Sequence, residues 1–360
     1  MNTKNYTSFL CNLAILSALV GCNVLSMLTG AETKINGKMQ DEHFEESYVI
    51  FTDGAKFFAL DTLHASIHDL GAYPGASEFT FYQNNIFYFD GSTHLRRYDF
   101  YTNTEHSVIT ENVSALEVHQ GKLFFKDSSG DLCYLDHAGD TSKDCSGAPA
   151  SFTGLSWIQS DHITNKLFGC VGSSIKELDF SGQSANTLAP GGTGNAFCNP
   201  SSKYYHDGVF VYDDGTSNTE TYSTGSNYGS NLVPHANILN MNEHGEIFYL
   251  TSGLTSSHSH GGGSTNISDI SPQPYPVIST HEKVYFIQSN EVHEAQKWQT
   301  GTTNQLTSLG ESPYWLARGP GSLFFFHSGG IDELFPDGGR ERVSSMGLLS
   351  AGYKVIYPAW

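Results

Sequence analysis

The clearest structural signal in the chain is Ile86-Phe87-Tyr88-Phe89-Asp90-Gly91. Four apolar residues in a row, three of them aromatic, favour a short strand that is buried on both faces. Asp-Gly directly after them is a common turn signal, because glycine reaches the positive φ angles that tight hairpins need. We therefore expect a buried strand that ends in a hairpin.

The same pattern recurs along the chain, and successive runs begin 37 to 44 residues apart. A period of about 40 residues with short apolar strands is typical of β-propellers, whose blades are four-stranded sheets. Neighbouring blades cover both faces of the central strands, which explains why the runs do not alternate between apolar and polar residues. The eight runs are Tyr48–Phe51, Ile86–Phe89, Leu123–Phe125, Leu167–Phe168, Val209–Tyr212, Ile247–Leu250, Val284–Ile287 and Leu323–Phe326.

Two repeats can be divided into four strands each. In the second repeat we expect strands at Phe79–Gln83, Ile86–Asp90, His94–Asp99 and His106–Thr110. In the seventh repeat we expect strands at Val277–Thr280, Lys283–Gln288, Val292–Trp298 and Asn304–Thr307.

The two ends of the repeat series predict how the fold closes. The first repeat begins at its second strand near Tyr48, and one strand, Tyr353–Tyr357, is left over after the eighth repeat. If this C-terminal strand were innermost in the first blade, no open edge would remain between the first and last blades. We expect an all-β chain whose residues 46–360 form a β-propeller of eight four-stranded blades. Seven blades are the alternative, because the repeat after Leu250 is poorly defined.

The repeats resemble propeller families with a Tyr-Phe-Asp or Tyr-Trp-Thr-Asp signature, including the DUF5050 type and the low-density-lipoprotein-receptor type. The closest match is Ile50-Phe51-Thr52-Asp53, whereas Phe124-Phe125-Lys126-Asp127 and Phe325-Phe326-His327 depart from the signature. An eight-bladed lipoprotein propeller is also similar, at the level of fold, to BamB of the outer-membrane protein assembly machinery. These resemblances imply a propeller, and a fold alone does not assign a function.

The N-terminal segment is predicted to direct export. Phe9–Val20 is mostly apolar and shorter than the roughly 20 apolar residues of a transmembrane helix. Leu19-Val20-Gly21-Cys22 resembles the lipobox of bacterial lipoproteins, where the signal is cut before a cysteine whose thiol is then acylated. We expect a signal peptide at 1–21, an acylated Cys22 that holds the protein on the lipid bilayer, and a tether over 22–45. An ordinary secretory signal or a retained anchor helix is the alternative.

The lipoprotein resemblance also implies a location. Asn23 follows the cysteine in place of the aspartate that often retains lipoproteins in an inner membrane. An outer-membrane lipoprotein, facing the periplasm or the cell surface, is therefore expected. The formal net charge of −19 argues against nucleic acid as a partner, because nucleic-acid-binding proteins carry basic patches.

Four cysteines remain besides Cys22 once the signal is removed, and an even number in an exported protein suggests disulfides. Cys133 and Cys145 lie within one repeat, on strands expected to be neighbours, and Cys170 with Cys198 would link adjacent repeats. Free buried thiols are the alternative.

Motifs for catalysis and metal binding are weak. The sequence has no GxSxG, HExxH or P-loop pattern. His258 and His260 would project to the same side of an extended backbone and, with a third ligand, could bind zinc or copper. A solvated loop is the alternative for that segment. Hydrolytic propellers use inward-facing carboxylates, but recurrence from blade to blade favours a turn role for Asp53, Asp90, Asp127 and Asp213.

These features favour a cell-envelope lipoprotein that acts as a binding or scaffold propeller for a protein, a peptide or a glycan, without a cofactor. Two other classes of function stay open. One is a propeller enzyme, a glycan hydrolase or lyase, with its site at the mouth of the central channel. The other is a metal-binding protein that uses the loop with His258 and His260.

Overall fold

The computed structural model describes residues 48–357 with gaps, and the gaps of five or more residues are 72–77, 146–151, 188–197, 199–203, 259–263, 269–276, 298–302, 308–312 and 346–353. The described residues belong to one compact unit, Glu46–Trp360. Their regular elements are β-strands, which confirms the predicted all-β class. The predicted signal, Cys22 and the tether lie outside the described residues. Within the described part, no helix is long and apolar enough to cross a membrane.

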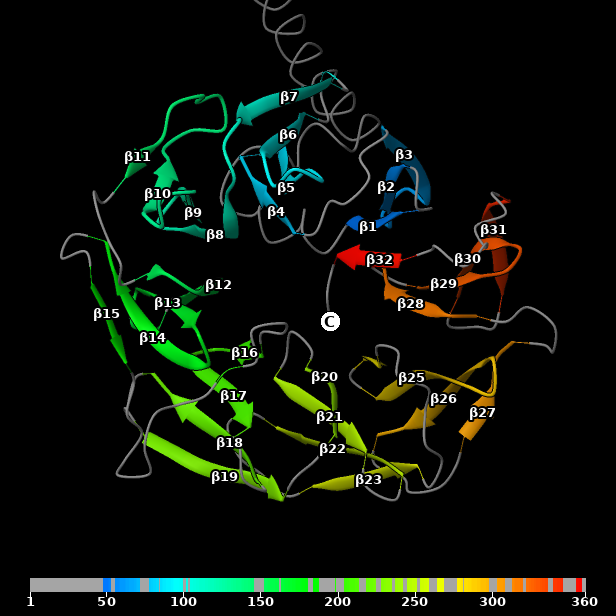
Figure 1. The fold of residues 1–360 in the computed structure, drawn as a ribbon. Coiled ribbons are helices and arrows are strands. Elements are labelled where there is room, and N and C mark those ends of the chain that lie inside the picture. Colours follow the sequence, from blue (N-terminus) through cyan, green and yellow to red (C-terminus); the bar gives the residue numbers. More distant parts are fainter. Residues whose placement is uncertain are drawn as a thin grey trace, which may run out of the picture. The chain divides into compact units, whose positions relative to one another are not determined.

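The described strands form eight four-stranded antiparallel sheets, which we name A to H in chain order (Figure 1). Sheet A consists of β1 (Tyr48–Thr52), β2 (Phe57–Asp61), β3 (Ser66–Gly71) and β32 (Lys354–Tyr357), and sheet B of β4 (Phe79–Tyr82), β5 (Asn85–Phe89), β6 (Leu95–Asp99) and β7 (Thr104–Ile109). Sheet C consists of β8 (Ser114–His119), β9 (Lys122–Lys126), β10 (Leu132–Leu135) and β11 (Asp144–Cys145). Sheet D consists of β12 (Leu155–Asp161), β13 (Lys166–Val171), β14 (Ser174–Asp179) and β15 (Ser184–Thr187).

Sheets E to H follow the same plan. Sheet E consists of β16 (Tyr205–His206), β17 (Val209–Asp213), β18 (Asn218–Ser223) and β19 (Tyr228–Pro234), and sheet F of β20 (Asn237–Met241), β21 (Glu246–Leu250), β22 (Leu254–His258) and β23 (Thr265–Ser268). Sheet G consists of β24 (Ile278–Ser279), β25 (Lys283–Gln288), β26 (Glu291–Gln296) and β27 (Thr303–Gln305). Sheet H consists of β28 (Trp315–Arg318), β29 (Leu323–His327), β30 (Gly330–Leu334) and β31 (Arg340–Ser344).

The central strands are buried on both faces, as their continuous apolar runs predict. All five residues of β5 and all five of β29 are buried. Outer strands differ, and in β31 Arg340, Glu341 and Arg342 are exposed. A strand whose two faces are both covered requires a packing partner on each side of its sheet.

Each sheet finds these partners in the sheets before and after it. Apolar residues of sheets B and C share one cluster, in which Phe87 packs with Phe125. Across the A–B junction the rings of Phe57 and Phe79 lie 5.8 Å apart. The other junctions are represented by Phe124 with Leu167, Cys170 with Phe210, Val211 with Ile247, Phe248 with Phe286, Ile287 with Phe325, and Phe326 with Phe51. Successive four-stranded sheets packed in this way are typical of propellers.

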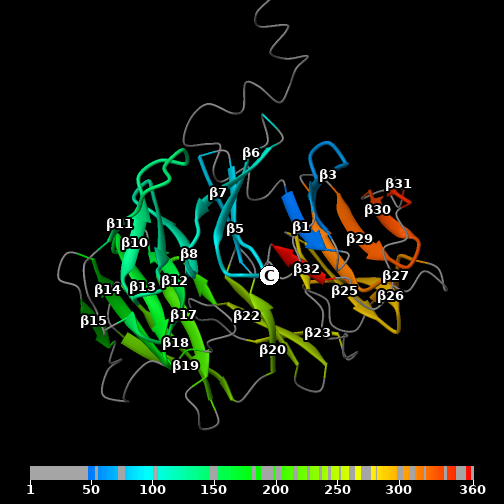
Figure 2. The same ribbon diagram turned by 45° about the horizontal axis from the view of Figure 1, so that its top comes forward.

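The C-terminal strand joins the first sheet. β32 pairs antiparallel with β1, with Phe51 opposite Val355, and sheet A has the order β3-β2-β1-β32. In both ribbon views β32 (red) lies beside β1 (blue) (Figures 1 and 2). The predicted C-terminal strand therefore occupies the expected place and begins one residue later than predicted.

The strand limits predicted for the second and seventh repeats agree with the structure to within two residues. The repeat that is poorly defined after Leu250 forms β22 and β23, so it contributes a full four-stranded sheet. Its pattern is hard to recognise because β22 reads Leu-Thr-Ser-Ser-His and offers one apolar residue.

Candidate binding surface

The recurring aspartate Asp90 closes the turn after a central strand. Its Oδ1 accepts hydrogen bonds from the backbone amides of Ser92 (2.8 Å) and His94 (3.0 Å). Its Oδ2 accepts one from Arg96 Nε (2.8 Å). Burial alone would raise the pKa of Asp90, but these donors outweigh burial and lower it. The turn role predicted for this carboxylate agrees with these contacts.

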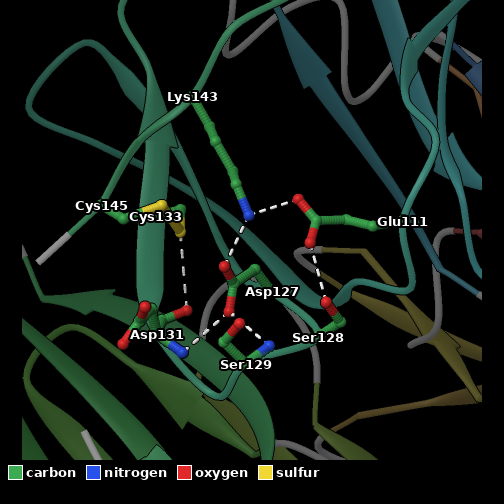
Figure 3. A network of polar contacts seen from close by, with 8 residues as sticks. All are labelled: Glu111, Asp127, Ser128, Ser129, Asp131, Cys133, Lys143 and Cys145. Carbon is green, nitrogen blue, oxygen red and sulfur yellow. Dashed lines mark hydrogen bonds and ion pairs between the residues drawn. A yellow bond between two sulfur atoms is a disulfide. The ribbon is translucent and has the colours of Figure 1, made fainter. Parts of the chain in front are cut away.

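Asp127 does the same in sheet C, within the polar network of Figure 3. Its Oδ1 accepts from the amides of Ser129 and Asp131, both at 2.9 Å. Its Oδ2 lies 2.5 Å from Lys143 Nζ, which also forms an ion pair with Glu111. Burial would raise the pKa of Asp127, but Lys143 and the turn amides lower it. Asp53 and the side chain of Asp213 lie outside the described residues.

A disulfide holds Lys143 in this network. Cys133 of β10 and Cys145 of β11 are directly opposite in the sheet and are joined, as the sequence predicts. Among described groups of three or more His, Cys, Asp or Glu residues, Asp127, Cys133 and Cys145 have ligand atoms close enough to one another to hold a metal ion. Both sulfurs are part of the disulfide that joins β10 to β11, so they do not serve as thiolate ligands for a metal ion (Figure 3). We call this disulfide the Cys133–Cys145 strap.

The second predicted pair, Cys170 and Cys198, is also joined, with Cα atoms 5.9 Å apart. Cys170 belongs to β13, and Cys198 packs against the cluster shared by sheets D and E. Disulfides persist in oxidising compartments, so the two bridges indicate an extracytoplasmic location.

In sheet H a histidine takes the place of the turn aspartate. The amide of Gly329 donates to His327 Nδ1 (3.1 Å), just as turn amides donate to Asp90 and Asp127. His327 Nε2 lies 3.3 Å from Asp332, which also forms ion pairs with Arg340 and Arg342. Asp332 is therefore paired with cations on the outer strand β31.

The first hairpins of sheets B to E are linked from sheet to sheet, and we call them the hairpin rim. The rim contains Gln83, Gln120-Gly121, Ile163–Asn165 and Asp207-Gly208. The Tyr82 hydroxyl, at the end of β4, donates to the carbonyls of Gly121 (2.8 Å) and Asp136 in sheet C. Sheets C and D are joined by Gln120 Nε2 donating to Asn165 O (3.4 Å).

Two further contacts join sheets C and D beneath the rim. His119 Nδ1 lies 2.8 Å from Ser160 Oγ. The amide of Ser160 donates to Glu117 Oε1 (2.9 Å). Burial lowers the pKa of His119, whereas the nearby Asp161 opposes that change. Burial thus disfavours the charged form of His119, which serves as a hydrogen-bonding group between sheets.

Asp161 is the centre of the junction between sheets D and E and is fully buried. Its Oδ1 accepts from the Tyr205 hydroxyl (2.5 Å) and the Ile163 amide (3.1 Å), and its Oδ2 accepts from Thr164 Oγ1 (2.5 Å). Burial would raise the pKa of Asp161, but the hydrogen bonds lower it. Tyr205 in turn accepts from the Gly208 amide (2.9 Å), and burial together with Asp161 raises its pKa.

These contacts present Ile163 to solvent on a fixed turn. Its side chain is 56% exposed although its backbone amide is tied to Asp161. Leu63 of sheet A is 44% exposed on a turn of the same kind, tied by its amide to Asp61 Oδ1 (2.9 Å). Burying such an exposed apolar side chain against a protein partner would be favourable.

Sequence reasoning did not predict the rim. Asp161 and Tyr205 are 44 residues apart and meet only because sheets D and E are neighbours. The available signal was a polar residue at the end of an inner strand, directly before a hairpin, as in Tyr82, His119 and Asp161. The candidate ligand His260 and the side chain of His258 lie outside the described residues.

Comparison with protein-family models and with curated proteins found no match. The resemblance to the DUF5050 and low-density-lipoprotein-receptor types therefore stays a prediction. Among solved structures, the computationally designed Ika8 protein has a TM-score of 0.51 at 9% identity, over 80% of this chain and 93% of that chain. At this identity the similarity concerns the fold alone.

Two natural propeller proteins are also similar. BamB from Moraxella catarrhalis has a TM-score of 0.41 at 9% identity, over 69% of this chain and 81% of that chain. Virginiamycin B lyase from Staphylococcus aureus has a TM-score of 0.43 at 8% identity, over 69% of this chain and 90% of that chain. At these TM-scores neither similarity bears on activity.

Proposed function

We propose that the protein is a closed eight-bladed β-propeller, anchored at the cell envelope, that binds a protein partner through its hairpin rim. Sheets A to H are its blades. The packing of each sheet on the next, of sheet H on sheet A, and the β1–β32 pairing support this closure.

The observation that carries the binding function is the hairpin rim. Hydrogen bonds from Tyr82, Gln120 and Tyr205 tie four successive hairpins together, so the rim is ordered before a partner arrives. A preorganised surface loses little conformational entropy on binding. Ile163 supplies the exposed apolar anchor at its centre.

The anchor of this scaffold is an acylated Cys22 in the outer membrane. Leu19-Val20-Gly21-Cys22 supports acylation, and the two disulfides support an oxidising compartment. One acyl-bearing cysteine holds a protein on a bilayer without crossing it. A tether of residues 22–45 gives the propeller reach from the membrane surface.

The experiment is a crosslinking pull-down from native membranes with the full chain. Ile163→Asp places a charge at the centre of the rim and is expected to abolish enrichment of the partner. Leu63→Asp is the matched control, because it makes the same change on the same kind of turn outside the rim. Cys22→Ala tests the anchor and is expected to release the protein from the membrane fraction.

Either of two results would overturn the proposal. Equal loss of partner in the Ile163→Asp and Leu63→Asp variants would mean that the rim has no special role. Enrichment of glycan but of no protein, with Ile163→Asp unaffected, would replace the protein partner with a glycan bound elsewhere.

A further inference from the structure

Sheet G contains a group of buried polar atoms that no described residue satisfies. Gln288 Oε1, Glu291 Oε1 and both ring nitrogens of His293 are buried without a hydrogen-bond partner. Glu291 is 6% exposed. Buried polar groups in native proteins are nearly always paired, so such a group calls for a missing partner such as a water or an ion.

These three side chains share one face of sheet G. A two-residue turn, Ser289-Asn290, has φ angles of 49° and 63°, which is the pattern of a tight hairpin. It places Gln288 directly opposite Glu291, and Phe286 opposite His293. Cβ atoms of residues directly opposite in an antiparallel pair are about 4.5–5.5 Å apart. The side chains of Gln288, Glu291 and His293 are thus neighbours across and along the hairpin.

That face is turned toward sheet F. Phe286 packs in one cluster with Phe248 and Leu254 of sheet F, and its ring stacks on His293 at 5.8 Å. Ile287 and Val292 lie on the other face of sheet G and pack against sheet H. The alternation of side chains along a strand therefore directs the polar group into the F–G junction, away from bulk water.

In sheets B, C and H, the carboxylates near the turn after the central strand are paired with a cation. Asp90 and Asp127, which also follow central strands, are neutralised by Arg96 and Lys143. Asp332 beside His327 is neutralised by two arginines. Glu291 is a buried carboxylate to which no described cation is paired, and an unpaired buried charge is costly.

We infer that Gln288, Glu291 and His293 bind a divalent metal ion of the zinc class. A bound cation would balance the charge of the Glu291 carboxylate. It would also be coordinated by the lone pairs of the Gln288 amide oxygen and of one His293 ring nitrogen. Imidazole with oxygen ligands suits zinc and its first-row neighbours, whereas magnesium and calcium prefer oxygen alone. The site is separate from the hairpin rim, because it lies in sheet G.

The test is calorimetric titration of the purified, chelator-treated full chain with Zn²⁺, together with absorption spectra of Co²⁺ as a geometric probe. One Zn²⁺ per chain is expected to bind at this site and to raise the melting temperature. Glu291→Gln and His293→Gln are each expected to weaken Zn²⁺ binding at least about tenfold, since even outer-shell changes cost that much.

Two controls separate this site from other histidines and from general damage. Glu294→Gln alters the same strand on its other face, where Glu294 pairs with Lys283, and is expected to leave Zn²⁺ affinity unchanged. A His258→Ala, His260→Ala variant is expected to retain the Zn²⁺. Without metal, Glu291→Gln is expected to melt at or above the parent temperature, because it removes a buried charge. The inference is wrong if no Zn²⁺ binds, or if the Glu291 and His293 variants bind it as the parent does.

Discussion

At the scale of the residue, three buried aspartates accept hydrogen bonds from neighbouring donors and thereby fix the backbone. Asp90 and Asp127 organise turns within a sheet, and Asp161 organises a junction between sheets. In each case burial opposes ionisation and hydrogen-bond donors restore it, so the pKa lies below its ordinary value. Such carboxylates are ionised at neutral pH and already have their donors.

Asp161→Ala is expected to destabilise the fold strongly. The substitution leaves the half-buried hydroxyls of Tyr205 and Thr164 without their acceptor, which costs about 2–4 kcal/mol of unfolding free energy. Asp136→Ala is the control, because Asp136 is half exposed and pairs with Lys122 at the surface, where such pairs contribute about 0–1 kcal/mol. Urea denaturation of both variants measures the difference, and equal losses would contradict this role for Asp161.

Asp161 also predicts a pH dependence. The pKa of Asp161 is lower in the folded protein than its unfolded value of about 3.9. The ionised side chain therefore stabilises the fold fully above the unfolded pKa, and this stabilisation is lost as pH falls through the folded pKa. The parent is therefore expected to lose more stability on acidification below about pH 5 than Asp161→Asn does. Urea midpoints measured between neutral and acidic pH test this, and parallel curves would count against it.

At the scale of the element, the strands were predictable and the turns less so. Continuous apolar runs such as Ile86–Phe89 identify central strands because their burial comes from both sides. The turn after that run has its positive φ at Thr93 (60°), although Asp90-Gly91 suggested glycine. Asp90 itself fixes the turn by accepting two amides, and a short polar side chain can do this without a glycine at that position.

The Cys133–Cys145 strap makes a prediction at this scale. Replacing both cysteines by alanine is expected to lower the unfolding free energy by about 2–4 kcal/mol. It is also expected to loosen the segment that carries Lys143 to Asp127, which hydrogen exchange of residues 136–145 would show as loss of protection.

The second bridge provides the control for that experiment. Replacing Cys170 and Cys198 by alanine removes a disulfide elsewhere and is expected to leave protection of residues 136–145 unchanged. If both double variants lose protection there equally, the strap has no local role and the bridges act only on global stability.

At the scale of the whole molecule, the repeat period predicted the number and sequence of the sheets, and the leftover strand predicted the β1–β32 pairing. The hairpin rim could not be predicted, because it depends on which hairpins come together once sheets B to E are packed. Tyr82 and Asp136, for example, are 54 residues apart and meet across two sheets. Periodicity reports what each repeat shares, whereas a binding surface depends on what single repeats do differently.

The proposed closure through β32 is tested by removing that strand. A chain that stops after Ser345 lacks β32 and exposes β1 as an open edge, so it is expected to unfold at lower urea and to self-associate. A chain that stops after Tyr357 keeps β32 and is expected to behave as the parent. Sedimentation velocity and urea denaturation distinguish the two, and identical behaviour would argue against closure through β32.

Site-specific photocrosslinking in cells tests whether the hairpin rim binds a protein partner. A photoreactive amino acid is placed at position 163, on the rim, or at position 63, on the turn between β2 and β3 of sheet A, in cells with intact membranes. Binding through the rim predicts one discrete crosslinked protein from position 163 and none from position 63. The same adduct from both positions, or none from position 163, would contradict it.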